Sequence, residues 1–113
     1  MFGVELMSYR VRPLRYLLGW LIVGTRGGFT RAQIIMALRE MPQNANQLAT
    51  LLEKDYRTIR HHLQVLQKNR IITSAGERYG TTYFLSQEME ENYTLFEEIV
   101  NKFWKKEKKE EDR

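Results

Sequence analysis

The sequence contains no cysteine among its 113 residues. A chain without thiols forms neither disulfides nor thiolate metal sites, and this composition is typical of a reducing compartment. Long apolar runs are also lacking: the main candidate, residues 14–24, has about half the length of a membrane-spanning helix and contains Arg15 and Gly19. No small-residue cleavage pattern of a signal peptide follows it. We therefore predict a cytoplasmic protein with no membrane partner.

Patterns that carry catalysis are missing as well. There is no nucleophile elbow, no metal-ligand spacing and no pair of carboxylates in an apolar setting. His61 and His62 are the only histidines. Adjacent residues on a helix diverge by about 100°, so these two rings cannot chelate one ion from one face. We expect no enzyme activity, no metal site and no cofactor.

The charge is distributed unevenly along the chain. The formal net charge is +4, but residues 1–85 carry +7 and residues 86–113 carry −3. Within the basic part, the segment from Tyr56 to Arg70 contains no acidic residue at all. A segment with only cationic and hydrogen-bonding groups on its exposed side is suited to contact with a polyanion.

Apolar periodicity and capping residues predict a series of helices. Pro13 suits the first position of a helix that ends near Gly24. Thr30 with Gln33, and Asn44 with Gln47, have the spacing of capping boxes that open two further helices. A fourth helix is expected after Asp55, with Ile59, Leu63 and Leu66 along one face.

Beyond Asn69 the pattern changes to strands. Residues 71–73 and 81–85 are rich in β-branched and aromatic side chains, and Gly76 and Gly80 between them indicate a hairpin. Ser86 is expected to cap a last helix that runs to about Lys106. The order predicts a mainly α fold with a small β-hairpin, a winged helix-turn-helix with added N- and C-terminal helices. We assign residues 1–12 to an N-terminal arm, 13–106 to this domain with flanking dimerisation helices, and 107–113 to a charged tail.

The fourth helix is the predicted recognition helix. The residues placed to reach base edges in a major groove are Arg57, Thr58, His61 and Gln64. Those expected to contact phosphates are Thr50, Lys54 and Arg60. His62 is better explained as a packing or phosphate-side residue than as a base reader. Arg78 at the hairpin tip fits a minor-groove or phosphate contact and a solvated turn arginine equally well.

Two apolar faces suggest association of two copies. The residues expected at a dimer interface are Leu14, Leu18, Leu21, Phe96, Ile99, Phe103 and Trp104. A symmetric dimer would place two recognition helices about one DNA turn, roughly 34 Å, apart. The alternative is that these faces cover each other within one chain.

The segment from Ile59 to Ile72, IRHHLQVLQKNRII, resembles the ArsR-type winged-helix pattern V-S-x-H-L-x-x-L-x-x-x-G-L-V. His62-Leu63 matches its His-Leu pair, and the wing GERYGTTYFLS and the earlier GTRGGFTRAQI are similar to small winged-helix regulators common in archaea. The chain departs from the pattern at Arg60, where the family usually has Ser, and at Arg70, where it usually has Gly. Many members of the family sense metals, a role for which this chain offers no ligand set.

The residues and the resemblance together predict a homodimeric, sequence-specific regulator that binds double-stranded DNA, more commonly as a repressor. Two alternatives stay open at this stage. One is a winged-helix protein-protein interaction module of the transcription machinery, and the other is a nonspecific chromatin-like DNA binder.

Overall fold

The computed structural model describes residues 13–77 and 80–111. For residues 104–111 it describes the backbone only. The predicted arm, residues 1–12, and Arg78 therefore lie outside the described residues. The described residues divide into two compact units, one within residues 29–92 and one made of residues 13–28 with 93–111. No helix of the described residues is long and apolar enough to cross a membrane.

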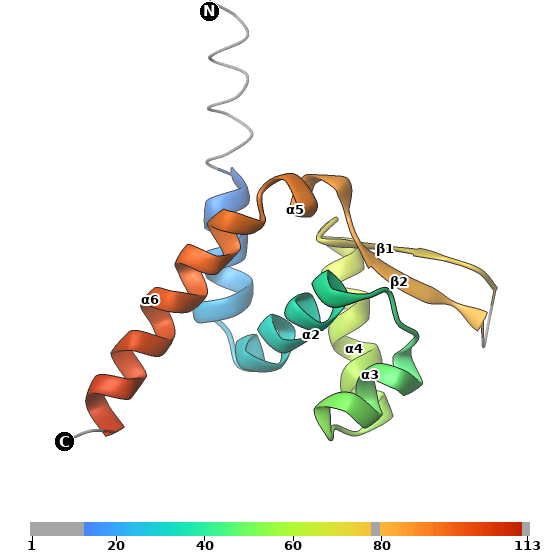
Figure 1. The fold of residues 1–113 in the computed structure, drawn as a ribbon, viewed down its shortest axis with the longest axis horizontal. Helices are drawn as coiled ribbons and strands as arrows, with labels where there is room; N and C mark the ends of the chain where they lie inside the picture. Colours follow the sequence, from blue (N-terminus) through green and yellow to red (C-terminus); the bar gives the residue numbers. More distant parts are fainter. Residues whose placement is uncertain (1–12, 78–79, 112–113) are drawn as a thin grey trace, which may run out of the picture. The chain divides into compact units, whose positions relative to one another are not determined.

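The unit 29–92 is a winged helix-turn-helix (Figure 1). Its helices are α2 (Gly28–Glu40), α3 (Ala45–Leu52), α4 (Tyr56–Lys68) and α5 (Gln87–Glu91), with strands β1 (Ile72–Ala75) and β2 (Thr82–Leu85) before α5. The strands pair antiparallel, with Ile72 opposite Leu85 and Ala75 opposite Thr82. The predicted fold class, mainly α with a small hairpin, is confirmed.

The core of this unit follows the predicted apolar faces. Its fully buried side chains include Ile34, Ile35, Leu48, Ile59, Leu63, Leu66, Ile71, Ile72 and Met89. The inner face of α4 and the first residue of β1 therefore belong to the same core. Burial of each large aliphatic side chain contributes about 1.5–3 kcal/mol, so this set fixes which side of α4 points inward.

Three of the four predicted helix N-caps are confirmed. The Asn44 side chain accepts the Gln47 N–H at 2.8 Å and the Gln47 side chain accepts the Asn44 N–H at 2.9 Å, a complete capping box. Asp55 caps α4 through the Arg57 N–H, and Ser86 caps α5 through the Met89 N–H. The start at Thr30 was wrong: α2 begins at Gly28, and Gln33 Oε1 makes no hydrogen bond among the described residues, so that capping box does not form.

The last helix also differs from its prediction. Instead of one helix from Ser86 to about Lys106, α5 ends at Glu91 and α6 runs from Tyr93 to Glu111. The break lies at Asn92, whose side-chain amide donates to the Glu88 carbonyl at 2.8 Å and so competes with helix continuation. The extension past Lys106 has a simple cause, since lysine and glutamate are good helix formers.

The other unit contains the first and last helices. Residues 13–18 are α-helical and continue into a π-helical turn, η1 (Gly19–Val23), capped by Gly24. This stretch contacts α6 and is linked to it by an ion pair between Arg15 and Glu98 at 3.4 Å. The π-turn was not predicted from the apolar period.

Candidate nucleic-acid interface

The outer side of α4 is an exposed, acid-free ridge. At about 100° per residue, Arg57, His61, Gln64 and Lys68 fall within about 60° of one another around the helix axis. All four are exposed, and they lie opposite the buried Ile59, Leu63 and Leu66. We call these four residues the outer ridge. Three of them were predicted to contact bases; Lys68 was missed, although the same spacing of three and four residues includes it.

The remaining predicted contacts lie around this ridge. Thr58 is exposed but lies about 100° from Arg57 around the axis, at the edge of the ridge. Thr50 and Lys54, on α3 and in the turn after it, are exposed as well. Arg60 is half-buried on the flank of α4 that turns toward β2. Each of these side chains is thus within a few residues of the ridge and accessible to solvent.

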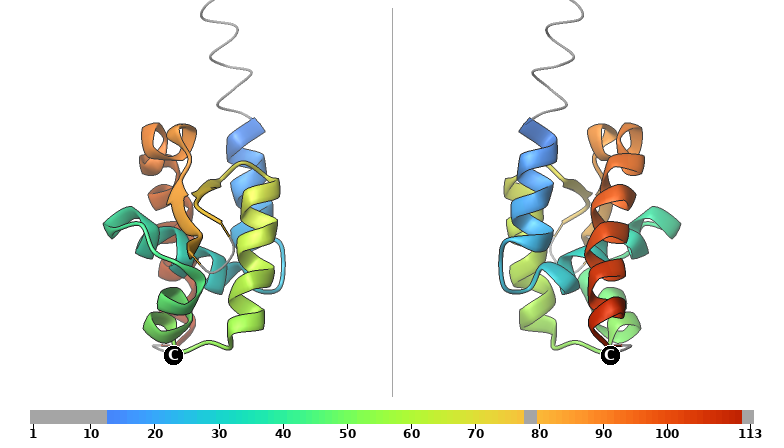
Figure 2. Two further views of the ribbon diagram at one scale, coloured as in Figure 1. Left: turned by 90° about the vertical axis from the view of Figure 1, so that its right-hand side faces the viewer. Right: turned by 90° about the vertical axis from the view of Figure 1, so that its left-hand side faces the viewer.

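A short loop joins α3 to α4 (Figure 2), and backbone hydrogen bonds close it. Glu53 adopts a left-handed conformation, with φ 55° and ψ 46°. Its N–H donates to the Thr50 carbonyl at 3.3 Å, and the Lys54 N–H donates to Ala49 at 3.0 Å. These two bonds form a Schellman motif, which satisfies the last carbonyls of α3 and fixes the angle at which α4 begins.

The end of α4 repeats this arrangement. Arg70, where the resembled family usually has Gly, is left-handed with φ 61°. The Arg70 N–H donates to Gln67 at 3.1 Å and the Ile71 N–H to Leu66 at 2.9 Å. Gln67 then donates to the Ser74 hydroxyl of β1 at 2.9 Å, so the helix is also tied to the wing. The non-glycine residue adopts this conformation at a cost of about 1–2 kcal/mol.

Beneath the ridge, α4 is held to α2 by a polar contact. Arg31 and His62 are 5% and 7% exposed, and the Arg31 guanidinium lies 3.2 Å from His62 Nδ1. A guanidinium only donates, so Nδ1 accepts and the neutral ring carries its proton on Nε2. Burial, and after it the charges of Arg31, His61 and Lys54, lower the pKa of His62 to about 4. Burial also lowers the pKa of Arg31. His62 was predicted to be a packing or phosphate-side residue, and its burial is that of a packing residue, whereas Arg31 had no signal in the sequence.

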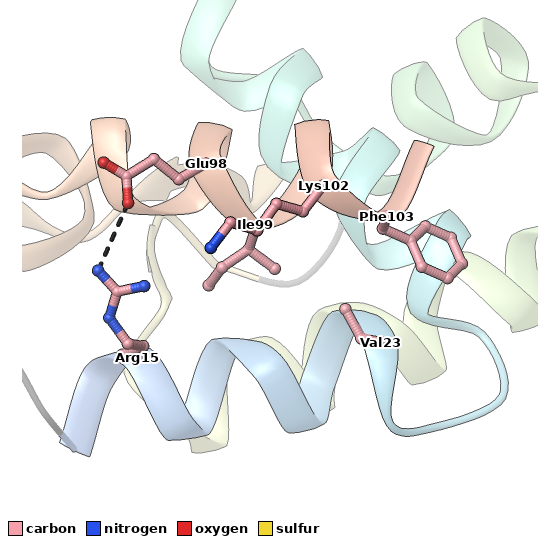
Figure 3. Close-up of a pocket in the computed structure, with 6 residues that line it drawn as sticks. All are labelled: Arg15, Val23, Glu98, Ile99, Lys102 and Phe103. Carbon is pink, nitrogen blue, oxygen red and sulfur yellow. Dashed lines mark hydrogen bonds and ion pairs between the residues drawn. The ribbon is translucent and has the colours of Figure 1, made fainter. Parts of the chain in front are cut away.

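The residues predicted at a dimer interface separate into two groups. Leu14, Leu18, Leu21 and Phe96 are buried within the single chain, so a partner cannot reach them in this conformation. Ile99 and Phe103 are half-buried and line a groove with Val23, Arg15, Glu98 and Lys102, of about 360 Å³ (Figure 3). The side chain of Trp104 lies outside the described residues.

The N-terminal helix exposes a second apolar stripe that sequence analysis did not select. Tyr16, Trp20 and Val23 are 77%, 55% and 48% exposed and occupy positions i, i+4 and i+7. Their spacing is that of one helix face, and Val23 continues directly into the groove. Large apolar side chains gathered on one surface in this way mark an interaction site more often than an inert surface.

Among the described residues, no group of three or more His, Cys, Asp or Glu side chains is placed to hold a metal ion. The candidate site consists of the cationic, hydrogen-bonding surface of α4 with a wing beside it. Such a surface is complementary to duplex DNA, whose phosphates supply the negative charge and whose major groove admits one helix.

Comparison with known proteins agrees with this geometry. Residues 29–74 match the family model described as "Bacterial regulatory protein, arsR family". This segment, which includes α2, α3, α4 and most of β1, is an ArsR-type helix-turn-helix, and the chain is a DNA-binding transcriptional regulator of the winged-helix class. The predicted resemblance is thereby confirmed. No curated protein sequence matches the chain.

Solved structures share the fold at low sequence identity. The transcriptional regulator HlyU from Vibrio vulnificus is 17% identical with a TM-score of 0.58, over 88% of this chain and 93% of that one. A probable transcriptional regulator from Pseudomonas aeruginosa is 22% identical with a TM-score of 0.55, over 90% and 81%. The adhesin competence repressor from Streptococcus pyogenes is 12% identical with a TM-score of 0.56, over 99% and 80%.

Proposed function

We propose that this protein is a homodimeric, sequence-specific regulator that represses transcription by occupying a promoter site. The observation that carries the proposal is the outer ridge, which is exposed, has no acidic residue and is held from its inner side. Phosphate contacts from the surrounding lysine and arginine residues would supply affinity through counterion release, and the ridge would discriminate bases. Repression follows from occupancy, because a protein on promoter DNA excludes other proteins from it.

In vitro selection of DNA sites, followed by sequencing, tests this function. We expect an enriched inverted repeat with half-sites about one turn of DNA apart. Recovery of unenriched sequences with equal affinity would instead indicate a nonspecific binder, and absence of duplex binding at about 150 mM salt would indicate a protein-interaction module.

Arg57→Ala tests whether the ridge reads bases. A bidentate arginine–guanine contact contributes about 1–3 kcal/mol of discrimination, so affinity for the selected site should fall by about tenfold or more while affinity for random DNA changes little. Arg26→Ala, an exposed arginine in the loop before α2, removes the same charge and serves as the control. Equal losses on both DNAs with Arg57→Ala would show that this residue contacts only the backbone.

For the dimer we propose the face formed by Tyr16, Trp20 and Val23 together with the groove residues Ile99 and Phe103. An apolar centre with ionic groups at its edge, here Arg15, Glu98 and Lys102, has the composition of a protein–protein interface. A two-fold axis would bring the same face of both copies together, as an isologous contact requires.

The mass in solution tests this interface. The chain has a mass of 13.5 kDa, and we expect light scattering to report twice that value. Trp20→Asp should give the monomer, whereas Leu51→Asp, at an exposed leucine of α3, should leave the dimer intact. A dimer that survives Trp20→Asp would place the interface elsewhere.

A further inference from the structure

A small polar hollow lies where α3, α4 and β2 meet. It has a volume of about 20 Å³ and is lined by Asn44, Ala45, Asn46, Tyr56, Arg60, Thr81 and Tyr83. A single water needs about 10–15 Å³, so the hollow has room for about one oxygen atom. It is therefore too small for an organic ligand but suitable for one oxygen of a larger anion that rests at its mouth.

Arg60 gives the hollow its charge. Its side chain is half-buried, and no described residue forms an ion pair or hydrogen bond with its guanidinium. A cation that is partly removed from water and has no counterion gains more from an anion than a fully solvated one does, because the local dielectric is lower. Tyr56, one helical turn earlier, adds a phenol, and Asn46 adds an amide from α3.

The three walls of the hollow are fixed before any ligand arrives. Residue Gln43, just before α3, pairs with Tyr83 of β2 through two backbone hydrogen bonds of 2.8 and 3.3 Å. The Asn44 capping box fixes the first turn of α3, and Asp55 fixes the first turn of α4. Because the backbone that carries the donors is fixed in this way, only the side chains themselves lose freedom on binding, which lowers the entropic cost.

The position of the hollow around α4 identifies the anion. Arg60 lies about 60° and Tyr56 about 100° from Arg57 around the helix axis. When the outer ridge faces the floor of a major groove, the flank with Tyr56 and Arg60 faces the wall of that groove, where the sugar–phosphate backbone runs.

We propose that this hollow is a seat for one phosphate of the DNA backbone, in which a non-bridging oxygen is bound by Arg60, Tyr56 and Asn46. The inference rests on the proposed DNA-binding function and adds to it a particular contact. The seat fixes the depth and register of α4, because a phosphate held at one point of the helix leaves the ridge a single position relative to the bases. Phosphate contacts position a protein in this manner, and base contacts specify the sequence.

The experiment replaces the phosphates of the selected duplex one at a time by neutral methylphosphonates. For the unmodified protein we expect one position in each half-site at which the replacement weakens binding about tenfold, the usual effect of losing a charge-assisted contact. Arg60→Ala should bind the unmodified duplex about tenfold more weakly, be insensitive to replacement at that same position, and show a salt slope shallower by about 0.9 for each copy bound.

Two further variants define the seat. Tyr56→Phe removes only the hydroxyl and should reduce the sensitivity at the same phosphate without changing the others. Gln67→Ala is the matched control, because Gln67 lies on the same flank of α4 but bonds to Ser74 and does not line the hollow. It should keep the full pattern of the unmodified protein.

The possible failures are distinguishable. If the protein selects and binds a duplex, but Arg60→Ala and Tyr56→Phe retain the phosphate pattern of the unmodified protein, the seat is refuted and the regulator function stands. If the unmodified protein binds no duplex, both proposals fail. Circular dichroism of each variant separates lost contacts from lost folding.

Discussion

The buried contact between Arg31 and His62 makes the stability of the protein depend on pH in a predictable way. The ordinary pKa of histidine is 6.5, and burial next to a guanidinium lowers the pKa of His62 to about 4. The unfolded chain therefore binds this proton more tightly than the folded protein does. Stability from this source is complete above pH 6.5, falls as the pH decreases below 6.5, and is fully lost below about pH 4.

The size of the effect follows from the shift. A difference of about 2.5 pH units corresponds to about 3 kcal/mol in the free energy of unfolding, of which about 2 kcal/mol is lost between pH 7 and pH 5. A domain of this size is stable by about 5–15 kcal/mol, so the loss is easily measured. Carboxylates contribute their own pH dependence in the same range and must be separated from it.

His62→Gln provides that separation. A glutamine oxygen accepts the Arg31 hydrogen bond but does not titrate, while every carboxylate stays the same. Urea unfolding followed by circular dichroism at pH 7 and pH 5 should show that the unmodified protein loses about 2 kcal/mol more than His62→Gln. His61→Gln, at the exposed neighbouring histidine, should keep most of this loss, because burial and the charge of Arg31 are the larger causes of the low pKa of His62. Identical losses for the unmodified protein and His62→Gln would refute the assigned burial and protonation state of His62.

Two other substitutions test the backbone. Arg70→Gly should raise the free energy of unfolding by about 1 kcal/mol, and Tm by about 4 °C, because glycine adopts the left-handed conformation without strain. Arg70→Ala keeps the Cβ atom and should change the free energy of unfolding little. Equal effects of the two substitutions would contradict the strain argument. Gly28→Ala should destabilise the protein by about 3 kcal/mol in thermal unfolding, because the new Cβ atom would lie 1.8 Å from the Ile22 carbonyl oxygen. A soluble variant with unchanged Tm would show that the start of α2 can shift.

The features that sequence analysis predicted correctly are those with local causes. The caps at Asn44, Asp55 and Ser86 each depend on residues two or three positions away, and the buried face of α4 follows from its own period. The two helix ends at Asn69 and Asn92 also have a local cause. Each asparagine donates its side-chain amide to the carbonyl four residues earlier, at 2.8 Å. An asparagine at such a position therefore marks the break between α5 and α6.

The features that were missed depend on residues far apart in the chain. Arg31 is 31 residues from His62, and a single arginine in an amphipathic segment predicts an exposed side chain, not a buried one. The hollow at Arg60 likewise needs Asn46 and Thr81, which come from separate elements. The apolar stripe of Tyr16, Trp20 and Val23 was hidden because the opposite face of the same helix has the stronger leucine pattern.

The contacts that orient α4 are all placed away from its outer ridge. Asp55 and the left-handed Glu53 fix where the helix begins, Arg31 holds its middle through His62, and Gln67 ties its end to the wing. None of these groups belongs to the ridge, so Arg57, His61, Gln64 and Lys68 keep their donors and acceptors for an external partner. A helix that discriminates bases by about 1–3 kcal/mol per contact needs separate residues to hold it in place, because a small rotation about its axis would misalign every base contact at once. It follows that substitution of Arg31, whose contact with His62 is buried, should reduce discrimination between sites without removing any group that contacts DNA.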